Sequence, residues 1–420
     1  MQWLNRAMLR LLIVNILDRE EKIMNEQIIT LASLTIDGKG SYGIGASAVP
    51  FSKDLYTYLR ITDIKDDGTL NLQDLKSVDD VKASEYLLKP NDIVFARTGA
   101  STGRNYFYDG TDGEFVYAGF LIKFSIDEKK VNPKYIKYFC QSKQYKDWIN
   151  SFNTGSTRGN INAQTLGKMP IPLIERKTQD ALVSIISSID EKIKKNNAIN
   201  NNLLEQVLAI YRHRFVDTTN ELRQTCRADE YFDISIGKTP PRKEPQWFST
   251  NPKDVTWVSI SDMGTCGLYI SESSEQLTRE AVVRHNVKIV PDNTVLLSFK
   301  LTVGRIAITD GEMTTNEAIA HFKTDKKEIN EYLYCYLKCF NYQTMGSTSS
   351  IATAVNSKII KGMPFIVPTD EEITEFHSLV APMFAKIKAN QTEISNLTAL
   401  RDTLLPKLMS GELDVSDIDL

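Results

Sequence analysis

The sequence predicts an α+β protein made of two copies of one unit, each a mixed α/β globular part followed by a long helix. Three observations lead to this prediction. Motifs of the first half return in the second half in the same order, short β-type runs alternate with short helical stretches, and two apolar patterns keep a 3.5-residue spacing. The duplication implies an internal pseudo-two-fold, and 420 residues are too many for one ordinary core.

Composition narrows the class of protein. Hydrophobic residues make up 42% and charged residues 25% of the chain, as in soluble globular proteins. A net charge of -3 gives no global attraction to nucleic acid, so such binding has to come from local patches or from a partner. Five cysteines without a CxxC favour a reducing compartment. No segment has the ~18 consecutive apolar residues of a membrane helix, so we expect a cytoplasmic protein without a membrane partner.

Residues 1–23 form an N-terminal extension of uncertain status. The extension has a basic start and a short apolar run, but Asn15 and Asp18 interrupt the run and no small-residue cleavage site follows. It is therefore a poor signal peptide. An amphipathic helix and a native start at Met24 both stay open.

Three pairs of segments define the repeat. "LRITDI" (59–64) pairs with "VSISDM" (258–263), and "GSTRGNINAQTLGKMP" (155–170) pairs with "GSTSSIATAVNSKIIKGMP" (346–364). "PNDIVFARTGASTGR" pairs with "PDNTVLLSFKLTVGR", position for position from the proline to the final Gly-Arg. The expected domains are a first globular domain at 24–174, a first helix at 175–216, a second globular domain at 217–368, a second helix at 369–411 and a tail at 412–420.

Each globular part combines β-type runs with short helical stretches, punctuated by Gly, Asn and Asp. The β-type runs are Ile93–Ala96, Tyr117–Phe124, Thr294–Ser298 and Arg305–Ile308. The helical stretches are Pro133–Trp148 and Ile329–Phe340. This mixture gives the α+β class.

Two long helices follow the globular parts. Their apolar and amide residues step by 4 and 3 throughout, which is typical of a coiled-coil seam. The first seam contains Leu182, Ile186, Ile189, Ile193, Asn196, Asn200, Leu203, Val207 and Ile210, and the second Phe376, Val380, Met383, Ile387, Asn390, Ile394, Leu397, Arg401 and Leu404. Thr369 and Glu372 form a capping box before the second helix, Gly411 ends it, and Pro406 should loosen its last turn.

Asn196 and Asn390 occupy equivalent seam positions near the midpoints of the two helices. In an antiparallel pair they should face each other at the pseudo-two-fold axis and fix the register of the helices. The alternative is that both side chains point to solvent where the seam opens.

Three segments carry a resemblance to a known family. "LTALRDTLLPKLMSGELDV" (397–415) closely resembles the final conserved region of specificity subunits of type I restriction–modification systems. "DISIGKTPPRKEPQWF" (233–248) is similar to the start of a target recognition domain of that family, and "MPIPLIERKTQDALVSIISSIDEKI" (169–193) to its central conserved helix. The first globular part departs from the pattern, since it lacks the Gly-Lys-Thr-Pro-Pro form.

The resemblance implies a DNA-reading function. Each globular part would be a target recognition domain for one half of a bipartite, asymmetric double-stranded DNA site. The paired antiparallel helices would set the distance between the halves and dock two adenine methyltransferase subunits, which restriction (translocase–nuclease) subunits then join. A specificity subunit of another methylase-based defence system and a coiled-coil adaptor with protein-binding globular ends stay open as alternatives.

Sequence motifs for catalysis are missing. The chain has no Asn-Pro-Pro-aromatic motif for a flipped adenine, no glycine-rich nucleoside fingerprint and no Walker A lysine. Pro291-Asp292 is not followed at close range by a Glu-x-Lys pair. We therefore expect no catalytic residue, cofactor or metal.

Cysteine and histidine residues support the same expectation. Cys335 and Cys339 lie one helical turn apart and could form half a metal site, but packed core thiols are the stronger interpretation. The histidines at 213, 285, 321 and 377 do not cluster and are expected at surface or boundary positions.

DNA contacts are expected from hydroxyl-rich and basic loops, because such side chains bind phosphates and base edges. In the first half the candidates are Arg97, Thr98, Ser101, Thr102, Arg104, Thr157, Arg158 and Asn160. In the second half they are Lys238, Thr239, Arg242, Lys243, Ser298, Lys300, Thr302, Arg305, Ser347 and Thr348, with Trp247 as a wall. For any one of them the alternative is a solvated loop residue.

Arg104 and Arg305 are retained in both copies, which indicates a shared structural or phosphate-binding role. Residues that read sequence should instead differ between the copies. The repeated Gly-Ser-Thr turn is expected to form the joint between globular part and helix. The target sequence itself does not follow from these residues.

Overall fold

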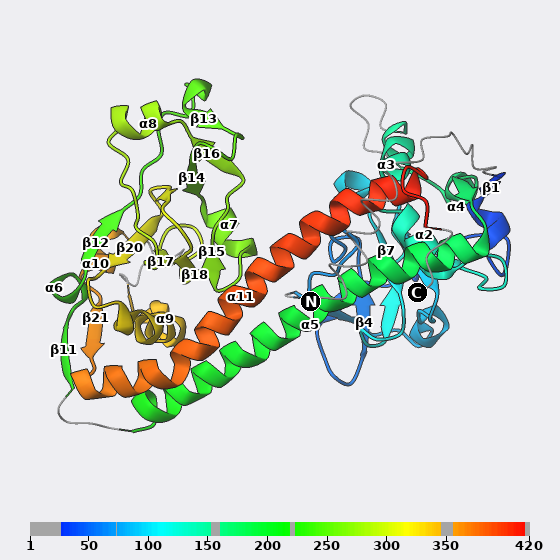
Figure 1. Cartoon of the computed structure of the whole chain (residues 1–420). Coiled ribbons are helices and arrows are strands. Elements are labelled where there is room, and N and C mark those ends of the chain that lie inside the picture. Colours follow the sequence, from blue (N-terminus) through cyan, green and yellow to red (C-terminus); the bar gives the residue numbers. More distant parts are fainter. Residues whose placement is uncertain (1–26, 73, 153–159, 219–222, 346–355, 416–420) are drawn as a thin grey trace. The chain divides into compact units, whose positions relative to one another are not determined.

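The computed structural model of the chain divides into two compact units (Figure 1). Unit 1 comprises residues 1–191 and 398–420, and unit 2 comprises residues 192–397. Sheets and helices occur in both, which confirms the α+β class. The structure describes residues 27–72, 74–152, 160–218, 223–345 and 356–415.

The described residues of unit 1 form two four-stranded sheets and a two-stranded ribbon. The first sheet has the order β2-β9-β6-β7 and is antiparallel; the second has the order β3-β5-β4-β8, with β8 parallel to β4. The ribbon pairs β1 with β10. The bounds are β1 Gln27–Thr30, β2 Ser41–Tyr42, β3 Ala48–Pro50, β4 Tyr56–Leu59, β5 Lys76–Val78, β6 Asp92–Ala96, β7 Asn105–Tyr108, β8 Phe115–Tyr117, β9 Leu121–Ser125 and β10 Pro170–Leu173.

Unit 2 repeats this topology with one strand added. Its first sheet has the order β12-β20-β17-β18-β15, its second β13-β16-β14-β19, and its ribbon pairs β11 with β21. Strand β19 is parallel to β14, as β8 is to β4. The bounds are β11 Gln224–Arg227, β12 Asp233–Ile236, β13 Phe248–Ser249, β14 Val255–Val258, β15 Tyr269–Ile270, β16 Glu275–Leu277, β17 Val295–Ser298, β18 Ile306–Thr309, β19 Thr314–Thr315, β20 Ile319–Lys323 and β21 Pro364–Val367.

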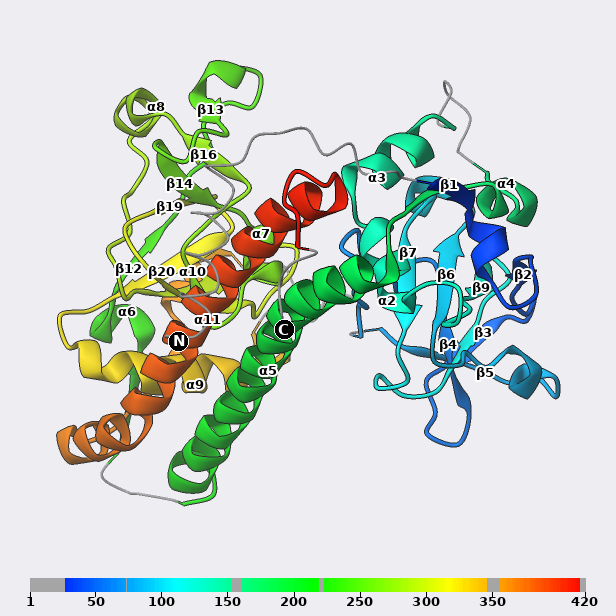
Figure 2. The same cartoon turned by 45° about the vertical axis from the view of Figure 1, so that its right-hand side comes forward.

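Helices cover the sheets and follow the ribbons (Figures 1 and 2). Their bounds are α2 Pro133–Phe139, α3 Lys143–Asn150, α4 Ala163–Gly167, α5 Arg176–Tyr211, α6 Ala228–Tyr231, α7 Ile260–Thr265, α8 Arg279–Arg284, α9 Asn330–Cys339, α10 Ser357–Lys361 and α11 Asp370–Met409. The stretch predicted as one helix at Pro133–Trp148 is two helices, because Ser142 caps a new one and accepts the Tyr145 N–H at 3.3 Å.

Residues 93–96 of the central strand β6 are all apolar because both faces of its sheet are covered. In β6, Ile93 and Phe95 join the core beneath the helices of unit 1, while Val94 and Ala96 join a second cluster on the other face. All four are at most 1% exposed. The run predicted at Tyr117–Phe124 is wrong as one strand, because the chain passes from one sheet to the other between β8 and β9.

The joint after each globular part is built in the same way in both units. Asn162 caps α4 by accepting the Thr165 N–H at 2.8 Å, and Asn356 caps α10 by accepting the Ile359 N–H at 3.0 Å. A buried methionine follows each helix. The Met169 carbonyl accepts the Leu31 N–H at 3.0 Å, and the Met363 carbonyl accepts the Ala228 N–H at 2.8 Å.

The seam pattern predicted for α5 and α11 agrees with the burial of their residues. Each of the predicted seam residues is buried or half-buried. The capping box is also confirmed, since the Glu372 carboxylate accepts the Thr369 N–H at 2.9 Å and the Thr369 hydroxyl accepts the Glu372 N–H at 3.2 Å. Gly411 follows α11 with φ +70°, a conformation that glycine adopts without strain.

Asn196 and Asn390 are both only 1% exposed, which excludes the solvent-facing alternative. They do not pair with each other. Asn196 donates to the Glu393 carboxylate at 2.9 Å, and Asn390 donates to the Asn200 side-chain oxygen at 2.8 Å. Partner numbers fall along one helix as they rise along the other, so these segments of unit 2 run antiparallel. Each asparagine thus forms a hydrogen bond with a residue of the other helix, in place of the predicted bond between the two asparagines.

Candidate nucleic-acid interface

In unit 1 the loop after β6 begins at Arg97. Its backbone N–H donates to the Phe120 carbonyl at 3.0 Å, and its own carbonyl accepts the Ile161 N–H at 2.9 Å. The guanidinium lies 5.1 Å above the Tyr42 ring, close enough for a cation–π contact. Its buried Nε has no hydrogen-bond acceptor among the described residues. The half-buried Arg97 side chain is therefore held beside an aromatic ring, with its Nε left without a partner in the described part of the chain.

Thr98 and Asn160 form a β-bridge, which brings two predicted DNA-binding segments together. Two aromatic side chains that the sequence analysis missed lie beside these segments: Phe120, 59% exposed, and Tyr42, 42% exposed. The Tyr42 hydroxyl accepts the Ala163 N–H at 3.1 Å, which ties it to the segment after Asn160. Exposed aromatic rings next to an arginine are suited to stacking on bases.

Arg104 ends the same loop and anchors it. Its Nε donates to the Asp66 carboxylate at 2.6 Å and its Nη1 to the Ile64 carbonyl at 3.4 Å. The Ser101 hydroxyl lies 3.5 Å from Nη1, and the Thr102 hydroxyl donates to a carbonyl within the loop at 2.8 Å. The loop is thus held against the segment that follows β4.

Arg305 anchors the equivalent loop of unit 2. Its Nη1 donates to the Ile260 carbonyl at 2.6 Å, and a Cβ at Gly264 would lie 2.4 Å from that nitrogen. Arg104 therefore donates to a carbonyl in the segment that follows β4, and Arg305 donates to a carbonyl in the segment that follows β14. This shared contact agrees with a structural role for the retained arginines.

Ser298 forms the base of the unit 2 loop. It is fully buried, its hydroxyl donates to the Thr302 carbonyl at 2.6 Å, and the same oxygen accepts the Arg305 N–H at 3.0 Å. This burial argues against a direct contact between the Ser298 hydroxyl and DNA. Lys300 and Thr302, further out on the loop, are exposed.

Two predicted segments of unit 2 meet at Glu317, which the sequence analysis did not single out. The Thr239 hydroxyl donates to the Glu317 carboxylate. Burial acts to raise the pKa of Glu317, but the Thr239 hydroxyl, a backbone N–H and the charges of Lys300 and Arg242 outweigh it and lower the pKa below its ordinary value. An ionised, exposed carboxylate among donors can accept a hydrogen bond from the amino group of cytosine.

The basic residues of the "GKTPPRKEPQW" segment differ in the contacts that hold their side chains in place. The Lys238 ammonium donates to the His285 carbonyl at 2.6 Å. Arg242 lies 4.2 Å from the Phe248 ring centre and 4.7 Å from that of Trp257, and it pairs with a glutamate carboxylate, Glu275, at 2.9 Å. Lys243 is exposed. Arg242 is thus pre-positioned, while Lys243 is not held in this way.

Trp247 was predicted as a wall of the interface. It is 5% exposed and packs in the core cluster of the second sheet with Trp257 and Leu277. Its indole N–H donates to the Glu244 carboxylate at 2.8 Å. This burial argues against a contact with DNA. The remaining candidates, Thr157, Arg158, Ser347 and Thr348, lie outside the described residues.

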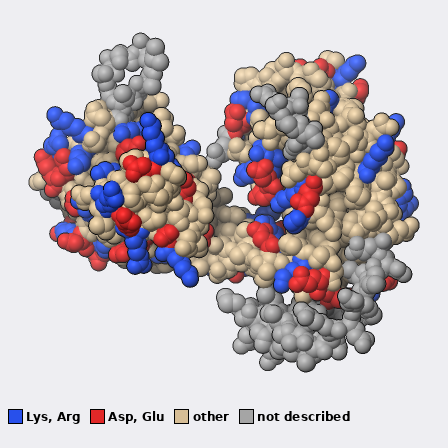
Figure 3. All heavy atoms as spheres, turned by 90° about the horizontal axis from the view of Figure 1, so that it is seen from above, with Lys and Arg blue, Asp and Glu red and all other residues tan. Residues whose placement is uncertain are grey.

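Charge does not form a single large basic field on the visible surface. On the face that Figure 3 presents, basic and acidic side chains are interspersed. None of the helices in the described part of the chain qualifies as a membrane-spanning segment. Nor do the described residues gather three His, Cys, Asp or Glu side chains able to hold a metal ion.

His321 corrects the expectation that all four histidines lie at the surface or boundary. It is fully buried in β20, with Nδ1 3.0 Å from the Ser235 hydroxyl and Nε2 2.7 Å from the Thr315 hydroxyl. Burial, aided by the charge of Lys323, lowers its pKa to about 3. Cys335 is likewise fully buried in the core of unit 2, as expected for a packed thiol.

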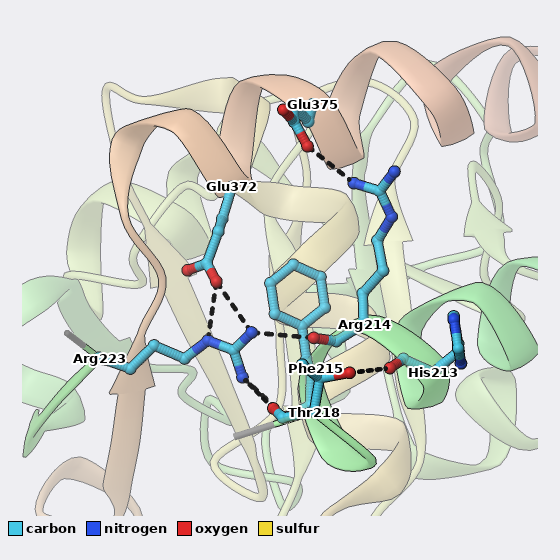
Figure 4. Close-up of a pocket in the computed structure, with 7 residues that line it drawn as sticks. All are labelled: His213, Arg214, Phe215, Thr218, Arg223, Glu372 and Glu375. Atoms are coloured by element: carbon cyan, nitrogen blue, oxygen red, sulfur yellow. Dashed lines mark hydrogen bonds and ion pairs between the residues drawn. The ribbon is translucent and has the colours of Figure 1, made fainter. Parts of the chain in front are cut away.

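A pocket at the end of α5 is filled by contacts that connect this end of the helix to the start of α11 (Figure 4). Arg223 points into it and donates to the Glu372 carboxylate at 2.8 Å and to the Arg214 carbonyl at 2.8 Å. The same guanidinium reaches the Phe215 and Thr218 carbonyls, each at 3.1 Å. Arg223 thus satisfies carbonyl groups past the end of α5 and joins them to the first turn of α11.

Comparisons with known proteins agree with this architecture. The family described as type I restriction modification DNA specificity domain matches residues 52–205 and 221–399. The chain is 21% identical over 407 residues to the type I restriction enzyme HindI specificity subunit of Haemophilus influenzae, covering 78% of this chain and 87% of that protein. It is 26% identical over 322 residues to the MjaIX specificity subunit of Methanocaldococcus jannaschii, covering 70% and 72%.

A solved structure shares the fold. The crystal structure of the type I restriction–modification system S subunit from M. genitalium superposes with a TM-score of 0.55 at 17% identity. The match covers 93% of this chain and 98% of that chain. At this identity the likeness concerns the fold.

Proposed function

The chain belongs to the type I restriction–modification DNA specificity family, as a specificity subunit and not an enzyme, and from this premise we propose how it reads DNA. Each globular unit reads one half of a bipartite, asymmetric double-stranded DNA site. The observation that carries the proposal is the pair of matched loops after β6 and β17, which stand on the same strand order but present different side chains. Two different readers on one repeated framework suit an asymmetric site.

In unit 1 the reading surface consists of the loop after β6 and the segment bridged to it. Arg97, Thr98 and Asn160 contribute donors and acceptors, and Ser101 and Thr102 lie further along the loop. We retain Thr157 and Arg158 as contacts on sequence grounds alone. Arg104 holds the loop and is 30% exposed, which leaves it able to reach a phosphate.

In unit 2 the reading surface surrounds Glu317. Thr239, Arg242 and Lys300 act on this carboxylate from two loops. The contacts proposed besides these are Lys238, Lys243, Thr302, Arg305, Ser347 and Thr348. Because the positive charges of Lys300 and Arg242 offset the negative charge of Glu317, the surface stays compatible with the phosphate backbone.

The two long helices serve as spacer and docking surface. At about 1.5 Å per residue, the 36 residues of α5 and the 40 residues of α11 give lengths of roughly 54 and 60 Å. We propose that they set the distance between the half-sites and dock two adenine methyltransferase subunits, through which restriction subunits join. The complex works in the cytoplasm, where it meets DNA.

DNA binding by the purified chain with its methyltransferase tests this function. Binding to a pool of genomic fragments is measured at about 50 and 200 mM salt. We expect affinity to fall steeply with salt for all fragments, because phosphate contacts release counterions, while a few fragments stay bound. A chain that assembles with a protein partner but retains no DNA at either salt would be an adaptor, which contradicts the proposal.

A further inference from the structure

The tip of the unit 2 loop exposes an apolar side chain in an unusual conformation. Leu301 is 100% exposed and its φ is +59°. The Thr302 N–H donates to the Lys300 carbonyl at 2.6 Å, so that Leu301 is the central residue of a γ-turn with positive φ. Such turns are rare because the Cβ of an L-residue clashes with the backbone.

The choice of leucine at this position is unfavourable for folding alone. Among the described residues, the other non-glycine residues with positive φ are Asn91, Asn286 and Asn293. Asparagine tolerates this region because its short polar side chain bonds locally. Leucine gains nothing there, and its side chain stays in water. Strained residues of this kind cluster at sites that bind ligands.

The loop holds Leu301 outward on a fixed base. Ser298 binds both sides of the loop through its buried hydroxyl, and its carbonyl accepts the Gly304 N–H at 3.0 Å. Gly304 has φ +90°, and a Cβ there would lie 3.1 Å from the Tyr342 ring. Phe299, next to the tip, is fully buried. The exposed leucine is therefore set on an anchored turn.

The surroundings of the tip fit one kind of partner. Lys300 precedes Leu301 and, with Arg242 and Thr239, surrounds Glu317. An apolar tip among cationic and hydroxyl donors is the combination that DNA-binding proteins use when they insert a side chain between base pairs and bind the flanking phosphates. A hydrophobic protein partner would not need this charge.

Building on the proposed function, we propose that Leu301 is a wedge that unstacks a base step in the half-site read by unit 2. The matching position in unit 1 is Ala100 in the sequence alignment and Gly99, with φ +74°, when counted from the end of the strand, and both residues are too small to act as a wedge. Unit 1 instead exposes Tyr42 and Phe120. The wedge therefore acts on one half of the site, which adds to the asymmetry of the pair.

The test uses Leu301→Asn in the full complex with methyltransferase. Asparagine adopts positive φ readily and has a similar size, so the turn should stay intact while the apolar tip is lost. We expect specific affinity to fall about tenfold or more, with the thermal midpoint unchanged or raised. The fall should vanish when the unit 2 half-site is scrambled and persist when the other half is scrambled.

Val283→Asn is the matched control, because Val283 is 82% exposed in α8 of the same unit. We expect it to bind like the wild type. 2-Aminopurine placed in the unit 2 half-site, away from the adenine to be methylated, should brighten with wild-type complex and stay dim with Leu301→Asn. Brightening by a protein without the wedge would overturn the inference.

The outcomes separate the two proposals. If the wild-type complex shows no sequence preference, the proposed function fails and the wedge with it. If the wild type is specific and Leu301→Asn binds equally well, only the wedge is wrong. A variant that weakens all DNA equally, or that no longer assembles with the methyltransferase, would likewise overturn the wedge, the latter in favour of a protein contact.

Discussion

The loops after β6 and β17 occupy the same place in the two units and end on the same Gly-Arg, yet they present different chemistry. The unit 1 loop lies beside exposed aromatic rings, with the Arg97 guanidinium 5.1 Å from the centre of the Tyr42 ring. The unit 2 loop projects Leu301 beside the cluster around Glu317. Beneath both, the strand order is shared. Folding therefore constrains the framework, and the loop tips are left to vary.

The strongest test of the shared framework is the methionine of each joint. Met169→Ala and Met363→Ala should each lower the free energy of unfolding of their unit by about 2–5 kcal/mol, because each removes a buried side chain and leaves a cavity. The wild-type side chains are 0% and 2% exposed. Urea denaturation measures both, with the exposed Lys168→Ala as a neutral control. A large loss in only one unit would break the equivalence.

Acid should affect the stability of the two units differently, because His321 of unit 2 occupies the strand position that Lys123 holds in unit 1, and a lysine does not titrate in the acid range. The folded pKa of His321, about 3, lies below its ordinary value of 6.5. The unfolded chain therefore binds the proton first, and stability is fully present above pH 6.5 and lost as pH falls toward 3. The loss is about 1.4 kcal/mol per pH unit in that window.

Tryptophan fluorescence can follow this loss in unit 2, which contains Trp247 and Trp257. Urea midpoints at pH 7 and pH 5 are compared for the wild type and His321→Gln, which stays neutral. We expect the variant to lose less stability on acidification. His377→Gln, at a half-buried position, is the control. Equal acid sensitivity of wild type and His321→Gln would contradict the role of His321.

The retained arginines should act alike on DNA. Arg104→Ala and Arg305→Ala are each expected to weaken binding of the complex by about the same factor, near tenfold, on all sequences, and to lower the salt slope by about 1. Asp66→Asn sharpens this, because it removes the ion pair of Arg104 and keeps the cation; affinity should stay within about twofold. A changed base preference at unchanged affinity would show base reading instead.

The smallest expected effects are at the helix caps of the joints. Asn162→Ala and Asn356→Ala should each cost about 1 kcal/mol of stability, because a backbone N–H at the start of α4 or α10 loses its acceptor. Asn→Asp at the same positions keeps an acceptor and should cost less. Thermal unfolding measures both. If the cap contributes to stability in only one unit, the two units share their strands but not the capping of these helices.

Much of this framework could be predicted from sequence, because repeats and 3.5-residue seams are local patterns. The turn from β8 to β9 could not, since an apolar run looks the same whether or not it changes sheet. The burial of His321 could not be predicted, because one of its two hydrogen-bond partners, Ser235, is 86 residues away in sequence. Arg104 and Asp66 are 38 residues apart, and neither segment indicates the other.

For the loops, the sequence indicated only which types of residue could contact DNA. The basic and hydroxyl side chains indicated candidate segments, and burial argues against Ser298 and Trp247 as direct contacts. Leu301 carried no sequence signal at all, because its exposure and its positive φ depend on the folded loop. Three-dimensional context decides which side chain of a loop faces outward.

Mapping of methylated adenines across the genome of a host that expresses this chain with its methyltransferase tests the central claim most directly. We predict one asymmetric motif with two specific parts separated by a fixed spacer. Changes confined to the 298–305 loop should alter only one part. A contiguous motif, or methylation that does not depend on the chain, would contradict the account.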